Sequence, residues 1–166
     1  MALYIKRDQT KNAGDERWPV YQIIHQLFKD GKKAEALMAL EKFVEANPDY
    51  AVAQNNLGVL YYEIGDKEKA LAHYQKAVEL EPGNATFLKN LADYYYGEQG
   101  LIEEAMKIYL KLLSLNDEDV DTFLIIGNIA AVLGKKEDAA VFYNKVLEIE
   151  PWNLTAMDNL EALQKA

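Results

Sequence analysis

A repeat length of about 34 residues constrains the fold of this chain more than any other feature of its sequence. Pro48 and Pro82 are separated by one such length, and Pro151 follows after two more. Aligned on these prolines, the sequence divides into four repeats: residues 17–50, 51–84, 85–119 and 120–153. The third repeat is one residue longer than the others, with the extra residue near the letters YGEQG. Such a period predicts an array of similar supersecondary elements.

Corresponding positions of the four repeats carry similar residues. An apolar residue recurs as Ile23, Leu57, Leu91 and Ile126, and a small residue recurs as Ala36, Ala70, Ala105 and Ala139. Each repeat also has a helix-breaking stretch near its middle, which reads KDGKK, EIGDK, GEQGL and VLGKK in turn. Because apolar residues follow a helical spacing on both sides of this stretch, each repeat is expected to form two helices joined by a turn.

Residues 51–82 resemble the tetratricopeptide repeat family. The matching residues are Leu57, Gly58, Tyr61, Gly65, Ala70, Tyr74, Ala77 and Pro82. Repeat four carries most of the same pattern, whereas repeat three has Ala92 in place of the first glycine and Asp117 in place of the proline. Repeat one has Ile24 where a small residue is expected, which predicts looser packing of its two helices. The resemblance implies an all-α fold, an α-α superhelix of the tetratricopeptide type built from helix–turn–helix repeats.

Two segments flank the repeats. Residues 154–166 are predicted to form a capping helix over the last repeat, with an apolar stripe formed by Leu154, Met157, Leu160 and Leu163. Residues 1–16 are expected to be either flexible or docked on the first repeat. In the docked alternative, Leu3, Tyr4 and Ile5 would cover the aromatic residues Trp18, Tyr21 and Phe28.

The charge of the chain limits the class of partner. The formal net charge is −9, which argues against nucleic acid because nucleic-acid-binding domains usually carry a basic patch. It favours a basic or neutral partner. No apolar run approaches the roughly 20 residues of a membrane span, and the first residues lack the apolar core of a signal peptide. We therefore expect a cytoplasmic protein, although a periplasmic fragment would have the same features.

The residues needed for catalysis are scarce. Ser114 is the one serine, His25 and His73 are the two histidines, and there is no cysteine. A nucleophile needs a base within hydrogen-bond reach, so we expect no enzyme, no cofactor and no metal site. Asp117, Asp119 and Asp121 alternate as ligands of a calcium loop do, but Thr122 and Asn128 replace the glycine and glutamate of such a loop. These aspartates are expected to lie at the start of a helix, where the helix dipole favours negative charge.

The resemblance also implies which residues face a partner. In this family the first helix of each repeat lines a concave surface. The residues expected there are Trp18, Tyr21, His25, Phe28, Asn55, Asn56, Val59, Tyr62, Lys89, Asn90, Asp93, Tyr96, Leu124 and Asn128. Some relatives bind the carboxylate tail of a heat-shock chaperone through lysine, arginine and asparagine side chains, but of those positions only Asn56 matches here. A reader of that kind is therefore not expected.

The leading hypothesis is a non-enzymatic protein–protein interaction scaffold that binds a peptide or helix of a partner in the concave groove. Aromatic residues supply contact area at interfaces, and asparagine amides can hydrogen-bond an extended backbone. Asparagine and tyrosine are also common at these positions throughout the family, so they could be general consensus residues. Two alternatives stay open: a structural protein that self-assembles into homo-oligomers, and the recognition module of a longer multidomain protein.

Overall fold

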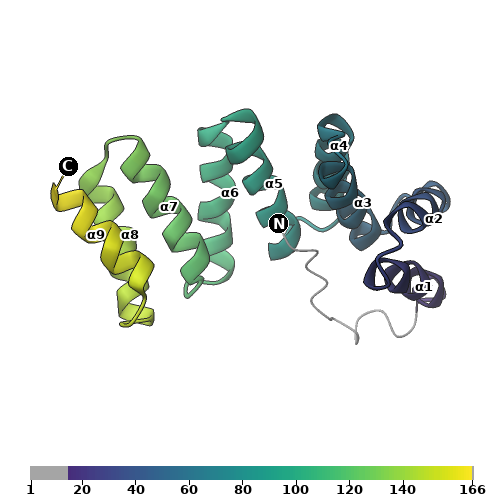
Figure 1. Ribbon diagram of the computed structural model, residues 1–166, viewed down its shortest axis with the longest axis horizontal. Helices are drawn as coiled ribbons and strands as arrows, with labels where there is room; N and C mark the ends of the chain where they lie inside the picture. The colour runs from purple at the N-terminus through teal and green to yellow at the C-terminus, as the bar shows by residue number, and fades with distance from the viewer. Residues whose placement is uncertain (1–14, 166) are drawn as a thin grey trace. The chain divides into compact units, whose positions relative to one another are not determined.

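The computed structural model describes residues 15–165, which form helices and no strands. The elements in chain order are α1 (Trp18–Lys29), α2 (Lys33–Ala46), α3 (Ala51–Glu63), α4 (Lys67–Leu80), α5 (Ala85–Tyr94), the π-helix η1 (Tyr95–Gln99), α6 (Ile102–Leu115), α7 (Val120–Val132), α8 (Lys136–Ile149) and α9 (Leu154–Lys165) (Figure 1). The predicted all-α fold class is confirmed. The expectation for the N-terminal segment, including Leu3, Tyr4 and Ile5, lies outside the described residues apart from residues 15 and 16.

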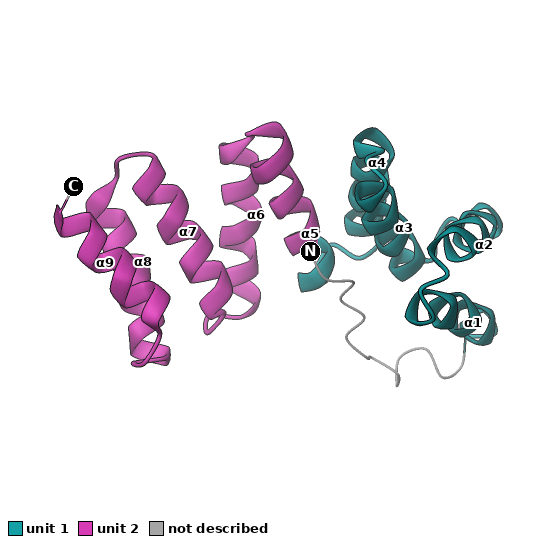
Figure 2. Cartoon of the chain, viewed as in Figure 1, with its two compact units in different colours: residues 1–87 teal, residues 88–166 magenta. Residues whose placement is uncertain are grey.

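The chain divides into two compact units, residues 1–87 (unit 1) and residues 88–166 (unit 2) (Figure 2). In unit 1, α1 packs against α2, α2 against α3, and α3 against α4. In unit 2, α6 packs against α7, α7 against α8, and α8 against α9. Within each unit, the helices of these pairs follow one another in sequence and are neighbours in space, as in repeat proteins whose repeats contact mainly their nearest neighbours. None of the described helices has the length and apolar character needed to cross a membrane.

Each hairpin turn contains a glycine that the predicted breaker identified. Gly31, Gly65, Gly100 and Gly134 have φ angles of 75°, 87°, 62° and 73°. In repeat two, the Asp66 N–H donates to the Tyr61 carbonyl (2.8 Å) across Gly65. A positive φ at this position closes a helix without the steric cost that a Cβ would bring.

The extra residue of repeat three is accommodated by the π-helix. The backbone bond that closes the first helix runs from Asp66 back to Tyr61 in repeat two, but from Leu101 back to Tyr95 (3.0 Å) in repeat three, one residue further. The additional residue widens the last turn of this first helix into η1. Single π turns of this kind frequently occur at functional sites.

Two helical glycines allow close contact with a tyrosine on the second helix of the same hairpin. A Cβ placed on Gly58 would lie 2.7 Å from Cδ1 of Tyr74, and a Cβ on Gly127 would lie 2.6 Å from Cε1 of Tyr143. Both tyrosines are buried. The glycines of repeats two and four are thus required by packing.

Repeat one differs from the predicted alignment. Ile23 was aligned with the buried Leu57, yet 67% of its surface is exposed, while Ile24 is buried at 4%. The reason is that α1 is the first described helix, and its main packing partner among residues 15–165 is α2. Within this part of the chain, no preceding helix covers Ile23 in the way that α2 covers α3 in repeat two.

The predicted C-terminal helix is present as α9, but its apolar stripe is rotated from the predicted one. Leu160 and Leu163 pack against the core around Tyr143, together with the buried Ala156. Leu154 and Met157 are exposed at 72% and 41%, so the prediction for these two residues was wrong. Ala156 is small enough to bring α9 close to α8, and this contact sets which face of α9 is buried.

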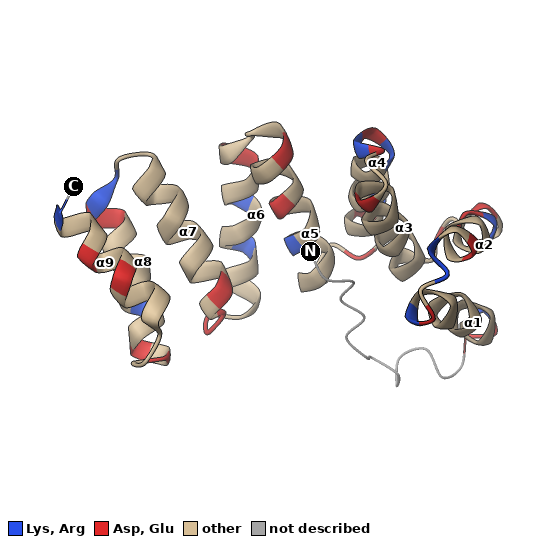
Figure 3. Cartoon of the chain, in the orientation of Figure 1, with Lys and Arg blue, Asp and Glu red and all other residues tan. Residues whose placement is uncertain are grey.

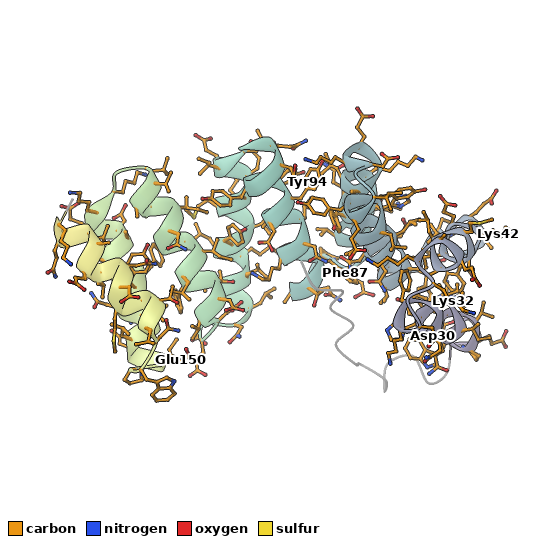
Figure 4. The ribbon with its side chains drawn as sticks, viewed as in Figure 1. Asp30, Lys32, Lys42, Phe87, Tyr94 and Glu150 are labelled. Atoms are coloured by element: carbon orange, nitrogen blue, oxygen red, sulfur yellow. The ribbon has the colours of Figure 1, made fainter. Side chains whose placement is uncertain are left out.

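The turn that precedes α9 is held by its own side chains. Glu150, at the end of α8 (Figure 4), accepts a hydrogen bond from Nδ2 of Asn153 (2.8 Å), and Oδ1 of Asn153 accepts one from the Ala156 N–H (3.0 Å). These contacts hold the start of α9 in place.

In unit 1, Phe87 (Figure 4) packs with Ala51 and Ala77. These contacts hold the start of α5 in place.

Candidate functional site

The first helices of the hairpins carry few charges, and the second helices carry many (Figure 3). Glu63 is the one charged residue of α3, and Asp121 is the one charged residue of α7. By contrast, α4 and α8 carry lysines and carboxylates, including the ion pairs Lys76–Glu79 (3.0 Å) and Lys145–Glu148 (2.6 Å). The charged side chains of the second helices thus lie in solvent. The first helices offer a less charged surface for contacts with other groups.

In unit 1 the structure buries several of the predicted partner-facing residues. Asn55, Asn56 and Val59 on α3 are exposed at 2%, 2% and 1%, and Tyr21 on α1 is exposed at 2%. These side chains are not accessible to a partner, so the expectation that they line an open groove was wrong. The other predicted residues of this unit, Trp18, His25, Phe28 and Tyr62, are half-buried.

Tyr21 accounts for part of this burial. Its hydroxyl accepts a hydrogen bond from Nδ2 of Asn56, and its ring packs against those of Trp18, Phe43 and Tyr50, with centroid distances of 5.8, 5.8 and 5.3 Å. Burial raises the pKa of Tyr21 above its ordinary value. Tyr21 therefore stays protonated, and its side chain packs beside α3 with its hydroxyl bonded to Asn56.

In unit 2 the predicted residues surround a cavity. Its volume is about 190 Å³, and it is lined by Asp93, Tyr96, Tyr109, Ile125 and Asn128. Small-molecule sites typically measure about 300–1,000 Å³. A cavity of this size is better matched to one side chain than to a cofactor.

Asp93 and Tyr109 form the polar wall of the cavity. The Tyr109 hydroxyl on α6 donates to Oδ1 of Asp93 on α5 at 2.7 Å. Burial, and then the bond to Asp93, raise the pKa of Tyr109 above its ordinary value, so the hydroxyl keeps its proton. Nζ of Lys89 lies 3.9 Å from the same Oδ1, at the outer limit of an ion pair.

Asn128, on α7, has its amide oriented by two donors. Its Oδ1 accepts from the Tyr143 hydroxyl (2.8 Å) and from Nδ2 of Asn159 on α9 (2.9 Å). Burial raises the pKa of Tyr143, which keeps this hydroxyl a donor. With the oxygen engaged twice, the NH₂ group of this exposed residue is directed away from these two donors. It can donate to a carbonyl oxygen of a ligand.

The remaining predicted residues of unit 2 do not line the cavity. Asn90 is buried at 7%, and Leu124 packs against the core around Phe123. The burial of Asn90 does not agree with the prediction that it faces a partner. Leu124 is half-buried, and the prediction for it stays a prediction.

Tyr109 and Ile125 are the two lining residues that the sequence interpretation did not select. A signal for Tyr109 does exist in the alignment. The ninth position of repeats three and four is polar, Asp93 and Asn128. Each accepts a hydrogen bond from the tyrosine on the second helix of its own repeat. Repeat two has Val59 at this position.

Outside the cavity, the titratable groups that the sequence analysis singled out are the aspartates near the start of α7 and the two histidines. Within residues 15–165, no three histidine or carboxylate side chains are grouped closely enough to hold a metal ion. Asp119 caps α7, where Oδ2 accepts from the Thr122 hydroxyl (2.8 Å), as expected for a carboxylate at a helix start. His25 and His73 lie on different hairpins, and burial lowers the pKa of each.

Family models of the tetratricopeptide repeat match three segments of the chain. One model matches residues 51–84, and a second model matches residues 88–119 and 120–151. Together these segments cover more than half of the sequence. A search of curated proteins finds no match.

Solved structures of the same family are similar in fold. A tetratricopeptide repeat protein from Parabacteroides merdae aligns with a TM-score of 0.81 and 24% identity, covering 92% of this chain and 60% of that chain. The MamA protein aligns with a TM-score of 0.77 and 20% identity, covering 92% and 82%. The first such domain of Spaghetti (RPAP3), bound to an HSP90 peptide, aligns with a TM-score of 0.60 and 25% identity, covering 69% and 90%.

Proposed function

Because this chain belongs to the tetratricopeptide repeat family, whose repeats form protein–protein interaction modules, we propose that it is a non-enzymatic scaffold holding a peptide or helix of a partner protein against its first helices. The contact centres on the cavity of unit 2. The observation that carries this proposal is the cavity itself, where Asp93, Tyr96 and Asn128 from two successive first helices converge.

The chemistry of this cavity suits peptide recognition. Ile125 and the ring of Tyr96 offer apolar contact, Asn128 offers an oriented amide donor, and Asp93 offers an acceptor. Interface residues of this kind combine aromatic anchors with a few fixed polar groups. The similar domain of Spaghetti is described as bound to an HSP90 peptide, which supports peptide binding as a general use of this fold.

The test is selection of binding peptides from a random library displayed on phage, with the double variant Tyr96→Ala and Asn128→Ala compared with the unsubstituted chain. We expect peptides that the unsubstituted protein retains and the double variant loses. The matched control is Asn144→Ala, an exposed amide on α8 outside the cavity, which should retain them. Equal retention by all three proteins, with unchanged helical circular dichroism, would place binding elsewhere.

Self-assembly is the second candidate function. Trp152 and Leu154, near the start of α9, are exposed at 74% and 72%. Large apolar side chains that are exposed together often mark an interaction surface. A molar mass by light scattering that rises with concentration, and that Trp152→Ser abolishes, would support this candidate, whereas a constant monomer mass would exclude it.

A further inference from the structure

The cavity of unit 2 has the chemistry of a receptor for a cation. We propose that it binds an arginine or lysine side chain of the partner peptide, with the carboxylate of Asp93 as the counter-ion. This inference rests on the proposed function, since it names the chemistry of the peptide held at the same site. It starts from the fact that Asp93 is the one charged residue among the five that line the cavity.

The carboxylate of Asp93 is accessible to a ligand. The Tyr109 hydroxyl donates to Oδ1, and Nζ of Lys89 lies 3.9 Å from the same oxygen. The Asp93 side chain keeps 27% of its surface exposed, so the carboxylate is accessible from solvent. A charged donor of a partner could therefore form a charge-assisted bond to Oδ2 while Tyr109 keeps its bond to Oδ1.

Tyr96 adds a second attraction for a cation. Its ring lines the same cavity as Asp93, and the face of an aromatic ring attracts guanidinium and ammonium groups. Ile125 supplies an apolar wall against which the methylene stem of a lysine or arginine can pack. Asn128 donates rather than accepts, so it is suited to a backbone carbonyl of the peptide and not to the cation itself.

The charge of the surrounding unit agrees with this assignment. Unit 2 contains 14 Asp or Glu residues and 7 Lys residues, which give a net charge of −7. Unit 1 contains 13 Asp or Glu residues and 11 Lys or Arg residues, for a net charge of −2. A cationic peptide would be attracted mainly to unit 2, where the cavity lies.

Lys89 makes the proposal sharply testable, because it is a cation already beside Asp93. Its Nζ is 3.9 Å from Oδ1 and is partly exposed, so the pair is loose. A cationic ligand would compete with this ammonium, whereas an anionic ligand would be attracted by it. Substitution of Lys89 should therefore change the two affinities in opposite directions.

The experiment is an NMR titration of the whole chain with the peptide Ala-Gly-Leu-Arg-Leu-Gly-Ala. Matched peptides carry citrulline, which is neutral and similar in shape, or glutamate in place of the arginine. We expect the arginine peptide to shift the amide signals of Asp93, Tyr96 and Asn128, and to bind about 10-fold or more tightly than the citrulline peptide. Asp93→Asn, which keeps an oxygen for Tyr109, should weaken the arginine peptide by about the same factor.

Three further variants control this test. Asp93→Glu should restore most of the affinity, and Lys89→Met should strengthen binding of the arginine peptide. Asp138→Asn removes an exposed carboxylate of α8 in the same unit and should have little effect, since it lies outside the cavity.

The outcomes separate this inference from the proposed function. Equal affinity for the arginine and citrulline peptides, or an equal loss in Asp138→Asn and Asp93→Asn, would overturn the cation site. Tighter binding of the glutamate peptide would overturn it as well and would assign Lys89 as the recognising charge. If phage selection yields peptides without cations that still need Tyr96 and Asn128, this inference fails while the proposed function stands. If selection yields no peptide lost by the double variant, the proposed function fails.

Discussion

Units 1 and 2 carry different residues at equivalent repeat positions. In unit 1 the first helix α3 is largely buried, whereas in unit 2 residues of the first helices line a cavity. The ninth position holds His25 and Val59 in unit 1 and Asp93 and Asn128 in unit 2. Val59 is buried at 1%, whereas Asp93 and Asn128 line a cavity of about 190 Å³. A shared scaffold can therefore use one position for packing in one hairpin and for recognition in another.

A second contrast concerns what lies beside the first helices. In unit 1 the buried Tyr21 bonds to Asn56 and covers part of α3. In unit 2 the last turn of the first helix of repeat three is the π-helix, and Tyr96 within it is only half-buried. In unit 1, the ring of Tyr21 covers part of α3. In unit 2, the extra residue of repeat three forms the π-helix, and the first helices there surround a cavity.

The largest effect on the free energy of unfolding is expected from removing the buried ring of Tyr21. Tyr21→Ala should lower the free energy of unfolding of unit 1 by about 3–5 kcal/mol, as for other large aromatic core residues. Tyr96→Ala in unit 2 should cost only about 1 kcal/mol because its side chain is half-buried. Urea unfolding measures both variants. The fluorescence of Trp18, in a Trp152→Phe background, reports on unit 1, and helical circular dichroism follows the Tyr96→Ala variant.

The control for this comparison is Tyr21→Phe, which keeps the ring and leaves the amide of Asn56 without the hydroxyl. Its cost should be about 1–3 kcal/mol. Equal stability of the Tyr21→Ala and Tyr96→Ala variants would contradict the distinction between a buried ring in unit 1 and a half-buried ring in unit 2.

A smaller effect is expected where repeats three and four differ within unit 2. Gly127→Ala places a Cβ 2.6 Å from Cε1 of Tyr143, so the ring must move, and overpacking of this kind costs about 1–3 kcal/mol. Repeat three carries Ala92 at the equivalent position. Ala92→Gly should cost about 1–2 kcal/mol, since it lowers helix propensity and removes a buried methyl group. Thermal unfolding measured by calorimetry would rank the two variants, and a neutral Gly127→Ala would show that Tyr143 has room to adjust.

The smallest effect is a change in the alkaline pH dependence of stability. Burial, and then Asp93, raise the pKa of Tyr109 in the folded state, while the unfolded chain keeps a value near 10. Its contribution to stability is therefore complete below pH 10 and is lost as the pH rises above 10, since the unfolded state then releases the proton first. Tyr109→Phe should reduce this decline by about 1.4 kcal/mol per pH unit.

Urea unfolding at pH 9, 10 and 11 measures this slope. Tyr95→Phe is the matched control, because Tyr95 lies on the neighbouring π-helix and its side chain is partly exposed. An identical slope for Tyr109→Phe and the unsubstituted chain would contradict the assigned role of this hydroxyl.

Much of the hairpin architecture could be predicted from the sequence because it depends on local chemistry. Glycines at positive φ end the first helices, and Gly58 and Gly127 admit the rings of Tyr74 and Tyr143. Asp119 was expected at a helix start and caps α7 there. Each of these features follows from residues within one repeat, so a periodic pattern is sufficient to locate it.

The accessibility of the site could not be predicted in the same way. Asn56 and Asn128 are both asparagines on first helices, yet one is buried beside Tyr21 and the other is exposed with its oxygen held by Tyr143 and Asn159. The outcome depends on residues 35 and 31 positions away in the sequence. Repeat periodicity describes each hairpin alone and does not contain these contacts.

The sequence by itself determined the class of fold, the hairpin turns and the close helix contacts, because these are set by steric requirements within a single repeat. Only the tertiary structure decided which first-helix side chains are buried and which surround the cavity of Asp93, Tyr96, Tyr109, Ile125 and Asn128. The physical reason is that burial is a property of neighbouring helices. One aromatic ring from an adjacent hairpin can remove a polar residue from solvent without changing the repeat that carries it.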